Sequence, residues 1–121
     1  MPPLVLIVDD EALIALDLQM QMEAAGYRTK LAFGLDEARY AFRSKRPDAI
    51  VLDLNLGGVS SELWAMELLA DGIPLIICSG NADQLESEAL RAQPRLSKPY
   101  QDGMLLTAVR NILSDQTSSS S

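Results

Sequence analysis

The chain contains no histidine. This absence excludes catalytic sites that pair histidine with serine or cysteine, histidine-rich metal sites, and a phosphohistidine on this chain itself. There is a single cysteine, Cys78, so no disulfide can form within the chain. Such sparing use of cysteine is typical of a reducing compartment, and we expect a cytoplasmic protein.

Basic residues are also few. The sequence has 10 Lys and Arg against 17 Asp and Glu, which gives a net charge of −7. A nucleic-acid-binding surface needs clustered positive charge, so we expect no nucleic-acid partner. No apolar run approaches the roughly 20 residues of a membrane span, and no basic region precedes the first apolar run as it does in a signal peptide. We therefore expect no membrane association.

Apolar residues make up 48% of the 121 residues, which is enough for one globular domain. Three short runs are apolar without interruption and are typical of strands buried on both faces. They are Leu4–Val8, Ala49–Leu52 and Pro74–Cys78. The runs Tyr27–Phe33 and Arg95–Ser97 mix charged and apolar residues, as half-exposed edge strands do.

Helical patterns separate these runs. We expect helices over about Ala12–Ala25, Asp36–Arg46, Ser61–Leu69 (with Ser60 or Ser61 as cap), Asp83–Arg91 and Asp102–Ser114. Strands that alternate with helices predict an α/β, doubly wound, five-stranded parallel sheet. Apolar strands in the interior and charged strands at the edges give the order 2-1-3-4-5. We expect residues 1–115 to form one domain and residues 116–121 to form a disordered polar tail.

In this order the second strand lies on one side of the first and the third strand lies on the other. Ligands of such folds bind at this switch point, between the first and third strands. Asp9 and Asp10 follow the first strand, and Asp53 ends the third. Three carboxylates at one sheet edge repel each other and are stable only when they are neutralised. Mg²⁺ prefers oxygen ligands and is often completed by a substrate phosphate, so the pattern predicts a magnesium site.

Two further strand ends carry groups that suit phosphate chemistry. Ser79 follows the fourth strand with a hydroxyl donor, and Lys98 follows the fifth with a positive charge. Together with an acidic metal site and a carboxylate nucleophile, they indicate phosphoryl transfer to an aspartate, for which we expect Asp53.

From about Leu4 to Leu113 the chain resembles the receiver domains of two-component response regulators, which are CheY-like, and in particular the stand-alone single-domain type. The residues that carry the resemblance are those at the strand ends: Asp9, Asp10, Asp53, Ser79 and Lys98-Pro99. The resemblance implies a phosphorelay protein that accepts a phosphoryl group on Asp53 from a partner histidine kinase. Such a protein catalyses only its own phosphorylation and dephosphorylation. It signals by conformational change or acts as a phosphate sink.

The same resemblance implies roles for single residues. Asp10 and Asp53 would bind Mg²⁺ directly, Asp9 through water and Asn55 through its backbone carbonyl. The phosphoryl oxygens would contact Ser79 and Lys98. Asn81, with Asn55, would flank the path of the attacking water and tune the phosphoryl lifetime.

The sequence departs from the receiver pattern at Arg95, where an aromatic switch residue is usual, and in the short spacing from Ser79 to Lys98. The segment Pro94–Tyr100 resembles a subgroup of stand-alone receivers, some of which serve HWE-type histidine kinases. The downstream target is not indicated by the sequence.

Other functions remain open at this stage. A haloacid-dehalogenase-like phosphatase needs an Asp-x-Asp pair, where this chain has Asp53-Leu54-Asn55. A flavodoxin-like flavin binder needs a phosphate loop after the first strand, where this chain has three acids that would repel the phosphate. A pseudo-receiver that docks a partner without being phosphorylated would share the whole pattern.

Overall fold

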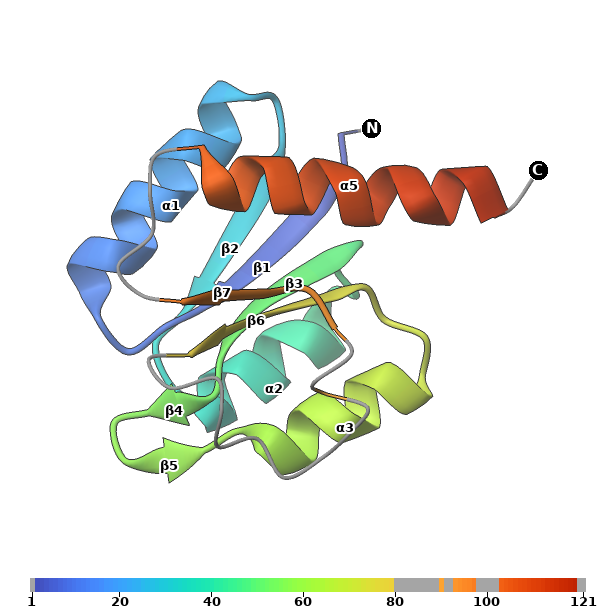
Figure 1. Cartoon of the computed structure of the whole chain (residues 1–121). Coiled ribbons are helices and arrows are strands. Elements are labelled where there is room, and N and C mark those ends of the chain that lie inside the picture. Colours follow the sequence, from blue (N-terminus) through green and yellow to red (C-terminus); the bar gives the residue numbers. More distant parts are fainter. Residues whose placement is uncertain (1, 80–89, 91–92, 98–102, 120–121) are drawn as a thin grey trace.

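A computed structural model of the chain describes residues 2–79, 90, 93–97 and 103–119. A five-stranded parallel sheet lies at its centre, in the order β2-β1-β3-β6-β7 (Figure 1). Its strands are β1 (Leu4–Val8), β2 (Arg28–Ala32), β3 (Ala49–Asp53), β6 (Leu75–Ser79) and β7 (Arg95–Ser97). Since β6 and β7 are the fourth and fifth strands of this sheet, the predicted order 2-1-3-4-5 is confirmed, with the two charged strands at the edges.

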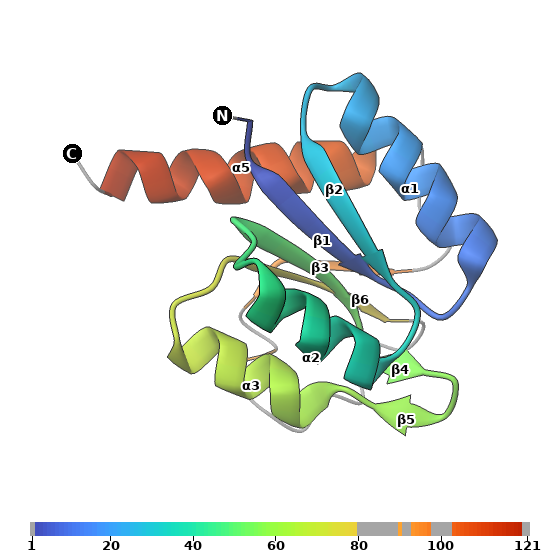
Figure 2. The same cartoon turned by 180° about the vertical axis from the view of Figure 1, so that it is seen from behind.

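Helices cover both faces of the sheet. They are α1 (Ala12–Ala24), α2 (Leu35–Ser44), α3 (Glu62–Ala70) and α5 (Met104–Ser119). In Figures 1 and 2, α1 and α5 lie on one face, and α2 and α3 lie on the other. The predicted doubly wound α/β fold is therefore confirmed. None of the described helices is both long enough and apolar enough to cross a membrane.

The sheet separates two apolar cores, and the interior strands contribute to both. In β1, Val5 and Ile7 pack with α1 and α5, whereas Leu6 and Val8 pack with α2 and α3. Burying each such Leu or Ile side chain stabilises the fold by about 1.5–3 kcal/mol. Because helices cover both faces, an interior strand needs apolar residues at every position, which is why the interior strands read as unbroken apolar runs. Cys78 on β6 is one of these buried residues.

The fourth predicted helix, Asp83–Arg91, lies outside the described residues except for Leu90, which is buried in the core shared with α2 and α3. The last helix differs from the prediction. It runs to Ser119, whereas the sequence predicted an end near Ser114 and a disordered tail from residue 116. No glycine or proline follows Ser114, so the sequence lacks a residue that would end the helix earlier. The expected boundary between residues 115 and 116 therefore falls within α5.

Candidate functional site

Three carboxylates meet where β1 and β3 end. The strands pair in register with Val8 opposite Leu52, so Asp9 and Asp53 lie one step further along, at the carboxyl edge of the sheet. One carboxylate oxygen from each of Asp9, Asp10 and Asp53 lies within 4.8 Å of the other two. Asp9 and Asp53 are buried, with exposed fractions of 2% and 5%, and Asp10 is exposed. The structure thus brings together the three acids that the sequence places at the switch point.

Main-chain donors orient the two buried carboxylates. The backbone N–H of Glu11 donates to Asp9 Oδ1 at 2.9 Å, and that of Asn55 donates to Asp53 Oδ1 at 3.0 Å. Asp9 also extends the sheet ladder, because its own N–H donates to the carbonyl of Ala32 at 3.1 Å. A hydrogen bond to a carboxylate is among the stronger ones in proteins. Each of these side chains is therefore held in place by the turn that follows it.

A small hairpin that the sequence did not predict follows Asp53. Strand β4 (Asn55–Leu56) pairs with β5 (Val59–Ser60) in antiparallel fashion. Gly57 and Gly58 join them with φ values of 63° and 90°, which fit the two-residue type I′ turn that needs positive φ at both positions. The Asn55 side-chain oxygen accepts a hydrogen bond from Gly58 N–H at 2.8 Å.

The hairpin reaches the acidic cluster. A Cβ atom added at Gly57 would lie 3.8 Å from Asp10 Oδ2. Asn55, whose backbone carbonyl we expect to bind metal, begins β4 and is exposed. The turn therefore borders the proposed metal site.

Ser61 also belongs to this site, and the sequence did not predict that. It is fully buried, and its hydroxyl donates to the backbone carbonyl of Asp53 at 2.7 Å. Its N–H donates to the carbonyl of Leu54 at 3.0 Å. We expected Ser60 or Ser61 to cap α3, but the Ser61 side chain makes no capping bond, and Ser60 Oγ accepts instead from Glu62 N–H at 3.2 Å. The two serines thus differ in burial and in hydrogen-bond partner, neither of which the sequence reveals.

The remaining predicted site residues lie on β6, on β7 or beyond them. Cys78 pairs with Asp53, so Ser79 ends β6 one step beyond the level of the proposed acceptor. Arg95 begins β7, pairs with Ile77 and is exposed, so it lies two residues back from that edge. Lys98 and Asn81 lie outside the described residues.

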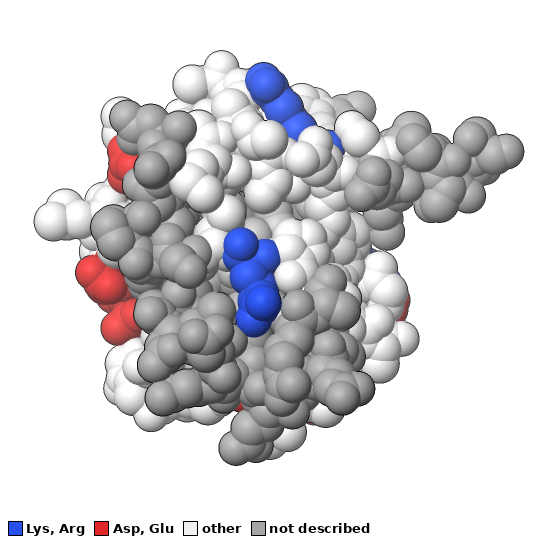
Figure 3. Space-filling view, viewed as in Figure 1, with Lys and Arg blue, Asp and Glu red and all other residues white. Residues whose placement is uncertain are grey.

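The donor set fits a magnesium ion. Three carboxylates supply hard oxygen ligands close together, and the exposed position of Asp10 leaves one side of the cluster accessible to solvent. Figure 3 shows acidic side chains at the surface near the amino end of α1, and in this view the described basic side chains do not form a continuous patch. A doubly wound sheet with an acidic cluster at its switch point is what the resemblance to receiver domains predicts.

Comparison with known proteins identifies the family. The profile of the response regulator receiver domain matches residues 5–110, so the chain belongs to the receiver domains of two-component response regulators. Receiver domains in general accept a phosphoryl group in signalling, bind Mg²⁺ and are not enzymes in their own right.

Curated relatives extend well beyond the matched region. A protein-glutamate methylesterase/protein-glutamine glutaminase of Anaeromyxobacter dehalogenans is 33% identical over 76% of this chain, but the match covers only 27% of that protein. The transcriptional regulatory protein PrrA of Mycobacterium tuberculosis is 31% identical over 92% of this chain and 50% of its own length. The chain thus spans half or less of the length of these two relatives.

Solved structures agree with the fold. A response regulator from Chloroflexus aurantiacus has a TM-score of 0.82 at 26% identity, covering 94% of this chain and 99% of that one. The receiver domain of NtrX from Brucella abortus has a TM-score of 0.80 at 25% identity, covering 91% and 98%. A CheY-like receiver from Methanospirillum hungatei reaches 0.86 at 23% identity, covering 98% and 99%, and supports the fold alone.

Proposed function

We propose that Asp53 accepts a phosphoryl group from a phosphohistidine on a partner histidine kinase, in a Mg²⁺-dependent reaction. The observation that carries this proposal is the meeting of Asp9, Asp10 and Asp53 within 4.8 Å at the switch point of a receiver fold. Asp53 is the member that ends the central strand β3. The other two acids come from the loop between β1 and α1.

The chain's own groups set up the transfer. The Asn55 N–H holds Asp53 Oδ1 and so fixes the plane of the carboxylate. A carboxylate oxygen forms the new P–O bond while the P–N bond to the donor imidazole breaks, and the imidazole nitrogen keeps the electron pair of the broken bond. Asp9, Asp10, Asp53 and the Asn55 carbonyl would hold Mg²⁺, which when bound offsets the negative charge of carboxylates and phosphoryl oxygens.

The other predicted residues act on the product. Ser79 and Lys98 would contact the phosphoryl oxygens as hydroxyl and ammonium donors. Asn81 and Asn55 would tune how fast water removes the phosphoryl group. Arg95 occupies the position where receivers carry an aromatic switch, so we propose that the response to phosphorylation is transmitted by a different contact.

Phosphorylation adds about −1.5 to −2 charges at this edge of the sheet. To move a two-state surface from 1:99 to 99:1, it must stabilise the active state by roughly 5.5 kcal/mol relative to the inactive one. We propose that this change, or simple storage of the phosphoryl group, is the output. The Pro94–Tyr100 segment supports an HWE-type kinase as donor.

The test is phosphoryl uptake from acetyl phosphate, followed by intact-mass measurement. Wild type should gain the mass of one phosphoryl group when Mg²⁺ is present and none when EDTA is added. Asp53→Ala should gain nothing. Asp17→Ala is the matched control, because Asp17 is an exposed acid on α1 that bonds only Gln21 among the described residues.

Uptake that survives in Asp53→Ala would assign the phosphoryl group to another residue. A wild type that takes up nothing, with Mg²⁺ present, would favour the pseudo-receiver function instead.

A further inference from the structure

A cavity lies away from the acidic cluster, between α2 and the part of the sheet formed by β1 and β2. Its volume is about 430 Å³. Leu4 and Arg28, the first residues of β1 and β2, line one end of the cavity. Asp9 follows the last residue of β1, at the opposite edge of the sheet. At about 3.3 Å per residue, Leu6, the β1 lining residue nearest the cluster, lies roughly 10 Å from Asp9 along the strand, and Leu4 lies roughly 16 Å from it. The cavity is therefore separate from the proposed phosphorylation site.

The floor of the cavity is apolar. Leu4 and Leu6 of β1 form it together with Ala41 of α2, and Tyr40 adds an aromatic ring that is largely exposed. Small-molecule sites in proteins have volumes of about 300–1,000 Å³ and a mostly apolar lining with a few placed polar groups. This cavity lies within that range and would hold a small aromatic ligand.

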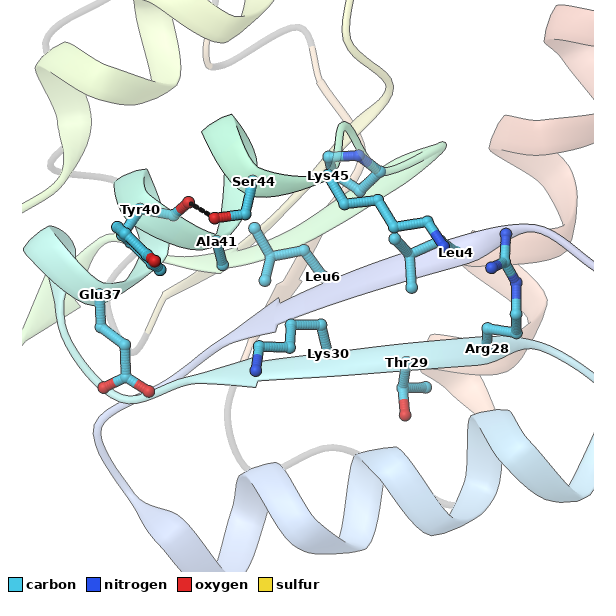
Figure 4. A pocket seen from close by; sticks show the side chains of 11 residues that line it. Leu4, Leu6, Arg28, Thr29, Lys30, Glu37, Tyr40, Ala41, Ser44 and Lys45 are labelled. Carbon is cyan, nitrogen blue, oxygen red and sulfur yellow. Dashed lines mark hydrogen bonds between the residues drawn. The ribbon is translucent and has the colours of Figure 1, made fainter.

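Basic side chains dominate the rim. Arg28, Lys30 and Lys45 line the cavity, against a single acid, Glu37. Figure 4 shows Lys45 extending from the end of α2 toward Arg28 beside Leu4, and Lys30 extending toward the end where Glu37 and Tyr40 lie. Three positive charges gathered at one cavity contrast with the net charge of −7 of the chain. The local field therefore favours an anion at a place where the molecule as a whole repels one.

Two features make these charges available to a ligand. Arg28 is held in place, because its Nε donates to the carbonyl of Pro2 at 2.9 Å and its backbone N–H donates to that of Pro3 at 2.9 Å. Within the described part of the chain, the ammonium groups of Lys30 and Lys45 have no hydrogen-bond or ion-pair partner. Arg28 is fixed by its hydrogen bonds, and the ammonium groups of Lys30 and Lys45 can turn toward a ligand. Above an apolar floor, these cations match a ligand with an apolar body and a negatively charged end.

We propose that this cavity, the α2–β2 pocket, binds a small organic anion with an aromatic apolar body and one carboxylate or sulfonate group. The apolar body lies on Leu4, Leu6 and Ala41, and the acid group lies between Arg28 and Lys45. The proposal does not depend on phosphorylation of Asp53.

The test uses 1-anilinonaphthalene-8-sulfonate as the probe and N-phenyl-1-naphthylamine as its uncharged counterpart, with the full chain. Fluorescence titration should show one sulfonate probe bound per chain and clearly weaker binding of the neutral compound. Amide shifts in ¹⁵N-correlated NMR spectra should move at Leu6, Lys30 and Ala41. Asp53→Ala should bind the probe as wild type does.

Charge reversal at Lys45, the residue that follows α2, supplies the decisive comparison. Lys45→Glu should weaken binding of the sulfonate probe about tenfold. Arg43→Glu changes the net charge equally and lies in the last turn of the same helix, but Arg43 does not line the pocket, so its effect should stay within about twofold. Ser44→Phe, which fills the pocket from its exposed rim, should abolish binding.

Three results would each overturn the proposal. The first is equal binding of the charged and uncharged compounds. The second is equal weakening by Lys45→Glu and Arg43→Glu. The third is a set of amide shifts centred on the exposed apolar residues of α1, Leu13, Leu16 and Met20, which would place the probe on that helix instead.

Discussion

Ser61 ties the backbone of the proposed phosphoacceptor to the start of α3, and this single bond should affect both stability and chemistry. Its hydroxyl is fully buried and lies 2.7 Å from the Asp53 carbonyl. Ser61→Ala leaves that carbonyl without this donor, so we expect the free energy of unfolding to fall by about 1–3 kcal/mol. Phosphoryl uptake should also slow, because the strand end that carries Asp53 loses its anchor. Urea unfolding and intact-mass kinetics measure the two effects.

The neighbouring serine is the matched control for this substitution. Ser60 is exposed, and its hydroxyl accepts from Glu62 N–H in a solvent-accessible position. Ser60→Ala removes only this long, exposed bond at the start of α3, so it should lower the free energy of unfolding by about 0.5 kcal/mol, the low end for a capping serine. Comparable losses in the two variants would show that the buried bond to Asp53 is not what stabilises this turn.

At the same scale, the acids could be predicted and the serine could not. Asp9 and Asp53 each end an unbroken apolar run, and parallel strands end at a common edge, so strand order alone brings them together. The Ser61 bond joins residues eight apart and depends on how the chain turns between them. From local sequence preference, Ser61 was expected to cap α3. In the structure the β4–β5 hairpin brings Ser61 back to the end of β3, where its hydroxyl bonds to Asp53.

The hairpin β4–β5 is the element that holds this turn, and its two glycines should not be equivalent. Gly58 has a φ of 90°, and nothing lies within 4 Å of a Cβ added there, so Gly58→Ala tests backbone strain alone. We expect a loss of about 1–2 kcal/mol in unfolding free energy. Gly57→Asn creates the Asn-Gly pair preferred in type I′ turns and should be close to neutral. Urea unfolding compares them, and equal losses would argue against this turn type.

Elements were predictable where burial dictates a pattern. The strands β1, β3 and β6 are covered on both faces, so each leaves a continuous apolar run in the sequence. The hairpin strands have two residues each, too few to show any alternation, and so they left only the Gly57-Gly58 signal of a turn. The end of α5 was placed too early because a polar composition was taken as the end of the helix.

On the scale of the whole molecule, charge is unevenly placed in a chain that is acidic overall. The carboxyl edge of the sheet gathers three acids, while the α2–β2 pocket gathers three basic side chains from β2 and from the end of α2. The acids lie at the switch point that the topology creates, and the basic side chains lie on an edge strand and at the end of a helix. On the two proposals above, this chain has two sites of opposite charge preference that are occupied independently.

The acidic cluster should make the stability of the whole domain depend on Mg²⁺. An ion that binds only the folded state stabilises it by about 2.7 kcal/mol at 100 times its Kd, which for a domain of this size raises Tm by roughly 10 °C. Asp10→Asn removes one of three mutually repelling carboxylates, so we expect a higher Tm than wild type without Mg²⁺ and little further rise with it. Thermal unfolding followed by circular dichroism, with NaCl at matched ionic strength, measures both.

Asp17→Asn, which changes an exposed acid outside the cluster, should keep the full Mg²⁺ response. An Asp10→Asn variant that is less stable without Mg²⁺, yet gains as much from the ion as wild type, would show that Asp10 is neither crowded by the other acids nor a metal ligand.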